Sequence, residues 1–260
     1  MTATYFLDPV PLWLLYLLSV TVVLLSIEVG WRLGNYRRQY SENENKAPVN
    51  AAVGATLGLL AFLLAFTFGM AASRFDTRKQ VVLQEANAIG TTYLRAEFLD
   101  KDARDEVRNL LREYAELRSG GGPVVMSPEG MEKSSLLLNK MWAVAANSVA
   151  TSNTYATGLF VQSLNELIDL ETTRVTALRN RIPDSIWFML AVVTIFAMIS
   201  MGFEFGLTGV RSWAVTVLLA VVFTTVLILI TDLDRSWAGS VQISQQPIID
   251  LLNKIGTPVP

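Results

Sequence analysis

Residues Gly58–Lys79 read GLLAFLLAFTFGMAASRFDTRK, with no charged residue before Arg74. The apolar run also continues upstream, so that Ala51–Ala72 contains no charge. About 20 apolar residues at ~1.5 Å rise per residue cover the ~30 Å hydrocarbon layer of a bilayer. This stretch therefore predicts a helix that crosses a membrane and ends at a polar boundary.

Three further runs without charge have the length and composition of a membrane span: Pro11–Ile27, Ser185–Phe203 and Ser212–Thr231. Residues 75–183 instead hold more than half of the charged residues, with apolar positions at helical spacing. We expect an all-α membrane protein in which an extramembrane helical bundle lies between the second and third spans. The expected organisation is transmembrane helices 1 and 2 in 1–74, the helical domain in 75–183, transmembrane helices 3 and 4 in 184–232, and a C-terminal tail in 233–260.

Composition excludes several classes of function. The chain has 52% hydrophobic and 17% charged residues, against about 25% charged in an average soluble domain. Because 21 Lys and Arg balance 23 Asp and Glu, we expect no nucleic-acid partner. Cysteine and histidine are both absent, which removes thiolate, imidazole and most zinc chemistry. The predicted spans contain no ionisable residue, so we expect no enzyme and no cofactor.

Turn and cap residues divide the central segment. Asp102 is expected to cap a helix that runs to about Arg118, and the glycines of Ser119–Pro123 break it. Ser127 then caps the next helix, because Pro128 follows in its first turn. The side of the membrane on which this bundle lies stays open, since the positive-inside rule gives opposite answers for different loops.

The second span carries the pattern with most bearing on function. Gly58, Phe62, Phe66 and Met70 recur every four residues, so we expect them to share one helical face. Two interpretations fit this face. Aromatic side chains one turn apart in a membrane helix commonly pack against a neighbouring helix, whereas the same ring from several subunits would form an apolar constriction around an ion pathway.

The same span resembles a known family. Phe62 and Phe66, followed after seven residues by Arg74 and Phe75, resemble the Phe-x-x-Gly-Phe-x7-Arg-Trp segment of the bestrophin pore helix. The whole chain is closer to the bacterial bestrophin-like domain family. The stretches that carry this second resemblance are Leu63–Phe68, Glu85–Arg95 and Asp232–Trp237, with Gly239 and Pro247.

The resemblance implies a homopentameric ion channel in the bacterial inner membrane, with the second helix of each subunit lining an axial pore. It implies a pore neck at Gly58, Phe62 and Phe66. Additional pore or vestibule positions would be Met70, Ser73, Arg74 and Glu85. Glycine at 58 replaces the bulky residue of the family, and Asp76 replaces an aromatic one.

The expected preference of the pathway for one sign of ion rests on a few charged residues after the neck. Arg74, Arg78 and Lys79 follow the neck and favour small anions such as chloride, while Asp76 lies among them. The alternative is that these basic residues only anchor the end of the helix at the lipid headgroups. For Glu85, a buried hydrogen bond to a neighbouring helix is the alternative to a vestibule position.

Two carboxylates follow the fourth span. Asp232 and Asp234 follow the fourth span where animal bestrophins bind calcium, but two carboxylates fall short of the 6–8 oxygens that Ca²⁺ takes. We therefore expect a turn or subunit contact there and no metal.

The rival to a channel is a membrane-anchored helical scaffold or sensor, in which the second span only packs.

Overall fold

All of the regular secondary structure that the computed structural model describes, over residues 10–40, 47–152, 154–209, 212–237 and 239–256, is helical. The expected all-α class is confirmed. The helices are α1 (Leu12–Tyr40), α2 (Ala47–Arg95), the 3-10 turn η1 (Ala96–Phe98), α3 (Lys101–Ser119), α4 (Gly121–Val125), α5 (Pro128–Thr151), α6 (Tyr155–Arg179), α7 (Asp184–Thr208), α8 (Trp213–Asp234) and α9 (Gln246–Gly256).

Four helical segments are long and apolar enough to cross a membrane, and they contain α1, α2, α7 and α8. Each of the four charge-free runs found in the sequence begins within four residues of the start of one of these helices. The chain is therefore a multi-pass membrane protein. α1 and α2 continue well beyond the apolar runs, because good helix formers such as Arg, Gln and Leu follow each run and no Pro interrupts them.

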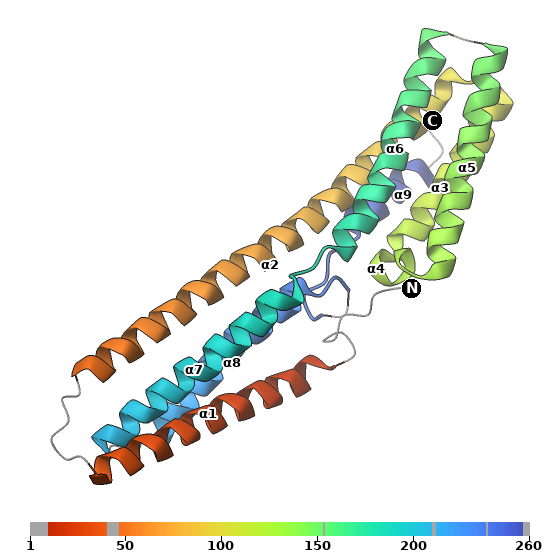
Figure 1. The fold of residues 1–260 in the computed structure, drawn as a ribbon. Helices are drawn as coiled ribbons and strands as arrows, with labels where there is room; N and C mark the ends of the chain where they lie inside the picture. The colour runs from red at the N-terminus through yellow and green to blue at the C-terminus, as the bar shows by residue number, and fades with distance from the viewer. Residues whose placement is uncertain (1–9, 41–46, 153, 210–211, 238, 257–260) are drawn as a thin grey trace. The chain divides into compact units, whose positions relative to one another are not determined.

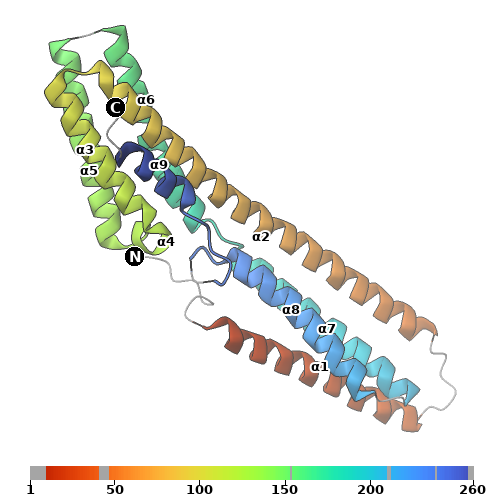
Figure 2. The same ribbon diagram turned by 180° about the vertical axis from the view of Figure 1, so that it is seen from behind.

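The described residues form two compact units. The first comprises residues within 1–73 and 181–240, and so contains α1, the beginning of α2, α7 and α8. In this unit α1 runs alongside α7 and α8 in both views (Figures 1 and 2). Its apolar core joins residues of all four helices, among them Ile27, Leu60, Met198 and Ile230.

Two glycine pairs let α1 and α7 approach closely. Each pair has the Gly-x-x-x-Gly spacing, with Gly30 and Gly34 on α1 and Gly202 and Gly206 on α7. A Cβ at Gly202 would overlap the backbone carbonyl of Ile27, and the other three positions meet opposing backbone in the same way. Such contacts between small residues drive helix association in membranes.

We expect Gly202→Ala to cost about 3 kcal/mol or more of stability, because the new methyl group displaces backbone rather than a flexible side chain. Thermal unfolding of the purified protein in detergent measures the loss. Gly158→Ala on α6 is the matched control, since nothing lies within 4 Å of a Cβ there. Equal melting temperatures for the two variants would contradict close backbone packing.

The second unit comprises residues within 74–180 and 241–260. Here α3, α5, α6 and the later part of α2 enclose a core that includes Leu111, Phe160 and Leu164. The short helix α9 lies beside α3 (Figure 2) and buries Ile248 fully. The segment that the sequence set apart as a C-terminal tail is thus divided, and its described residues 241–256 belong to this unit.

The helix ends of the second unit follow local sequence signals. Ser127 caps α5 as expected, because its hydroxyl accepts the Gly130 N–H at 2.9 Å. The expected cap of α3 is wrong by two residues: the carboxylate of Asp100 accepts the Ala103 N–H at 3.0 Å. Asp102 lies in the first turn, where an acid also favours the helix dipole, and this explains the misplaced boundary.

Candidate functional site

Two aromatic side chains of α2 project out of the first unit. Phe62 is 66% exposed and Phe66 is 57% exposed, although both lie within a membrane span. Their rings stack on one another, with centroids 6.5 Å apart and planes inclined by 17°. An aromatic pair that packed inside its own subunit would be buried, so this pair faces outside the subunit.

Glycines extend the open side of α2. At Gly54, Gly58 and Gly69 nothing lies within 4 Å of the position that a Cβ would occupy. These glycines are unlike those of α1 and α7, because no neighbouring backbone in the described chain requires them. Gly58, Phe62 and Phe66 therefore form one exposed apolar face of α2, which we call the neck face.

The opposite side of α2 is a packing surface. Leu60, Leu64, Thr67 and Ala71 are buried there against the apolar core of the first unit. The Thr67 hydroxyl donates to the Leu63 carbonyl at 2.7 Å, so this polar atom has a partner inside the helix. α2 is thus two-sided: one side packs against the core of the first unit and the other is exposed.

Met70, Ser73 and Arg74, which were expected to continue the neck face, do not all lie on the exposed side of α2. Met70 is half-buried and packs against the core, so its place on the face is wrong. A four-residue step turns about 400° on a helix of 3.6 residues per turn, and two such steps beyond Phe62 rotate Met70 by about 80°. Ser73 is exposed, and Arg74 is half-buried with its Nη1 atom buried.

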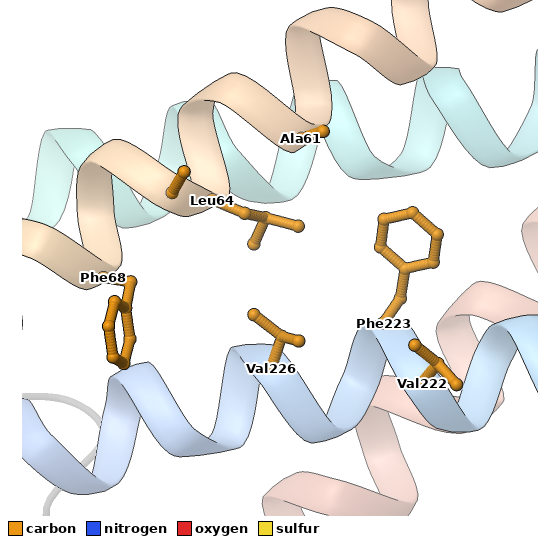
Figure 3. Close-up of a pocket in the computed structure, with 7 residues that line it drawn as sticks. Ala61, Leu64, Phe68, Val222, Phe223 and Val226 are labelled. Carbon is orange, nitrogen blue, oxygen red and sulfur yellow. The ribbon is translucent and has the colours of Figure 1, made fainter.

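An apolar groove of about 370 Å³ lies between α2 and α8. Figure 3 shows Leu64 and Phe68 of α2 directed toward α8, and Phe223 and Val226 of α8 directed toward α2. Every lining side chain is hydrocarbon, including those of Ala61, Ala65 and Val222. The groove can accommodate apolar side chains or acyl chains, and it offers no ligand for an ion.

Glu85 was expected in a vestibule, and the structure corrects this expectation. Its side chain is fully buried in the second unit and pairs with two arginines. The Arg118 Nε lies 2.6 Å from Glu85 Oε1, the Tyr114 hydroxyl donates to the same oxygen at 3.0 Å, and Arg174 pairs with Oε2. Each of these partners lies on a neighbouring helix, as the alternative interpretation expected.

The buried cluster joins four segments of the second unit: α2, α3, α6 and the stretch before α9. Arg174 also donates to the side-chain oxygen of Gln245 at 2.7 Å. Burial lowers the pKa of Arg174, which the charge of Glu85 opposes, and burial raises the pKa of Tyr114 well above its usual value. The phenol therefore stays protonated and acts as a donor. We interpret the cluster as structural, because Glu85 and Arg118 are fully buried and their partners come from several helices.

Arg78 also has a structural role. It is buried, and its guanidinium donates to the carbonyl oxygens of Ala177 at 3.2 Å and Asn180 at 3.0 Å. A cation at these last carbonyls stabilises the C-terminal end of α6. Asp76 and Lys79 are exposed. The three basic residues look equivalent in sequence, and the structure separates them by burial.

The two carboxylates at the end of the fourth span accept hydrogen bonds from backbone N–H groups. Asp232 accepts from the Ser240 N–H at 2.7 Å and from its hydroxyl at 2.6 Å, and Asp234 accepts the Ile182 N–H at 2.9 Å. These bonds fulfil the turn-stabilising role expected for them. Within the described residues, no group of three acidic, cysteine or histidine side chains is placed to hold a metal ion.

Comparisons with known proteins agree on one family. A family model described as the Bestrophin-like domain matches residues 15–248. Three solved structures of single-substitution variants of a bestrophin homologue from Klebsiella pneumoniae resemble the fold at 16%, 16% and 18% sequence identity. Their TM-scores are 0.65, 0.65 and 0.61, covering 92%, 92% and 93% of this chain and 96%, 95% and 94% of theirs. No curated protein matches the chain.

Proposed function

The chain belongs to the bestrophin-like domain family, and from this premise we propose that it is an ion channel whose pathway is lined by α2. The observation that carries the proposal is the neck face. Phe62 and Phe66 are large, apolar and exposed on the side of α2 opposite its packing surface. A ring of such side chains gates ions by dewetting, since water leaves a narrow apolar constriction and a small shift readmits it.

A pathway of this kind needs several copies of the chain. Each subunit contributes one α2, and one or two helices cannot enclose an axial pore. We propose a ring of five copies, as the resemblance implies, in which each neck face points to the axis. Heterologous contacts close into such rings when the rotation between neighbours fits.

We propose small inorganic ions as the permeant species and the bacterial inner membrane as the location. The anion preference expected from sequence rested on Arg74, Arg78 and Lys79. Arg78 is engaged with carbonyl oxygens of α6, and Arg74 is half-buried. The basic residues therefore support an anion preference less than their number indicates.

Native mass spectrometry of the detergent-solubilised protein tests the assembly. The expected particle has about five times the chain mass of 28.7 kDa. Monomers or dimers alone would remove the channel and favour the membrane-anchored scaffold. Gly158→Ala serves as a control for handling, because its substitution site is open and lies far in sequence from α2.

A further inference from the structure

We propose that a small pocket of the first unit binds the primary ammonium group of a zwitterionic phospholipid such as phosphatidylethanolamine. Residues of α1, α7 and α8 line this pocket, and all of them belong to the first unit. The pocket shares no residue with the neck face. The inference therefore goes beyond the proposed function and does not require that α2 line an ion pathway.

The pocket lies at the depth where lipid headgroups begin. On α1, Glu28 is the first charged residue after the apolar run Pro11–Ile27. Phe205 lies in the last turn of α7, which ends at Thr208, and Trp213 is the first residue of α8. Tryptophan is enriched at the boundary between the hydrocarbon layer and water. A headgroup in the adjacent leaflet can therefore reach the pocket.

The side chains of the pocket favour a cation. Of the described residues that line it, only Glu28 is charged. The pocket also has three aromatic side chains, which are Trp31, Phe205 and Trp213. The faces of such rings attract ammonium groups. The Thr216 hydroxyl donates to the Ser212 carbonyl at 3.1 Å, so its oxygen can still accept a hydrogen bond from a bound N–H group.

Arg32 supplies the complementary charge for a phosphate. Its Nε lies 2.9 Å from Glu28 Oε1, one turn along α1, and its side chain is 74% exposed. Because so exposed an ion pair contributes little, the guanidinium can turn to another acceptor at small cost. Arginine binds phosphate oxygens through several N–H groups at once. The Glu28–Arg32 pair thus matches a headgroup in which a short linker joins an ammonium group to a phosphate.

The size of the pocket selects among zwitterionic headgroups. Its volume is about 30 Å³. A cavity needs about 10–15 Å³ to hold one water molecule, and a primary ammonium group is of similar size to water. The ammonium group also brings N–H donors for the carboxylate and the hydroxyl. The trimethylammonium group of phosphatidylcholine is larger and has no donor, so we expect the pocket to exclude it.

Native mass spectrometry of the detergent-solubilised protein measures this preference. The probes are phosphatidylethanolamine and phosphatidylcholine with identical acyl chains, added at equal concentration. We expect the wild-type protein to retain phosphatidylethanolamine about tenfold more, the effect of one hydrogen bond to a charged group. Glu28→Gln should abolish the difference. Glu204→Gln is the matched control, because Glu204 is half-buried near the end of α7 but does not line the pocket.

Thr216→Leu separates the pocket from the ion pair at its edge. Leucine fills the space and leaves the charge of Glu28 in place, so phosphatidylethanolamine should lose its advantage in this variant too. Thermal unfolding of each variant checks that it is folded. Glu28→Gln alone decides the question if Thr216→Leu does not fold, because glutamine keeps the shape of glutamate.

The outcomes are independent of ion conduction. Equal retention of the two lipids by the wild-type protein, or an unchanged preference in Glu28→Gln, overturns the site and leaves the proposed channel untouched. Ethanolamine without acyl chains, added at the concentration of the lipid, should leave the bound lipid in place. If it displaces the lipid, the pocket takes a soluble amine and the phospholipid is overturned as its ligand.

Discussion

Replacing Glu85 by alanine should cost about 3–5 kcal/mol of stability, because it removes the carboxylate that lies closest to two buried arginines. Glu85 and Arg118 are fully buried, and the side chain of Arg174 is 3% exposed. Because both arginines are buried, water cannot take the place of the lost carboxylate. Denaturant or thermal unfolding of the purified protein measures the loss. The stability of Glu85→Gln should lie between those of Glu85→Ala and the wild-type protein, because glutamine keeps the shape of glutamate and one carbonyl acceptor.

The chain offers a matched control for this substitution. Glu97 also pairs with two arginines, Arg104 at 3.0 Å and Arg108 at 2.8 Å, but its side chain is 54% exposed. Exposed ion pairs contribute about 0–1 kcal/mol, so Glu97→Ala should have a small effect. Similar losses for the two variants would show that the Glu85 cluster does not anchor α2 in the second unit.

The spans and their order could be read from sequence, because hydrophobic run length alone identifies a membrane helix. Ser127 could be identified as a cap, because the proline and acid that follow it act locally. The α1–α7 contact was missed, although Gly30 with Gly34 and Gly202 with Gly206 carry its signal. The same Gly-x-x-x-Gly spacing in the first and third spans predicts their close approach.

The exposure of Phe62 and Phe66 on one side of α2 follows from their spacing, whereas contacts made by packing with other helices do not. Phe62 and Phe66 lie one turn apart, and both are exposed as the pore interpretation requires. Met70 lies two turns beyond Phe62, where the mismatch between 4 and 3.6 residues has rotated it into the core. The partners of Arg78 and Glu85 come from helices about 30 to 100 residues away in sequence. No spacing rule within α2 reports such contacts.

Shortening the neck should make the pathway leak. The double substitution Phe62→Ala/Phe66→Ala removes most of the apolar surface that repels water from the constriction, so basal ion flux should rise by at least an order of magnitude. Stability should change little, because both rings are more than half exposed and lose few contacts within their subunit. Ion flux into liposomes containing the purified protein measures the leak.

Leu60→Ala is the matched control on the other side of α2. Leu60 is fully buried, so truncating it should cost about 2–5 kcal/mol of stability while leaving the neck face intact. The variant should therefore melt earlier than the wild-type protein without conducting more. This contrast separates a leak through a widened neck from a leak caused by loosened packing.

Liposome flux and thermal stability of the same oligomer, measured together for Phe62→Ala/Phe66→Ala, test most directly whether α2 lines an ion pathway. The account predicts much higher flux at a melting temperature close to that of the wild-type protein. Unchanged flux with a lower melting temperature would assign Phe62 and Phe66 to packing and contradict the pore.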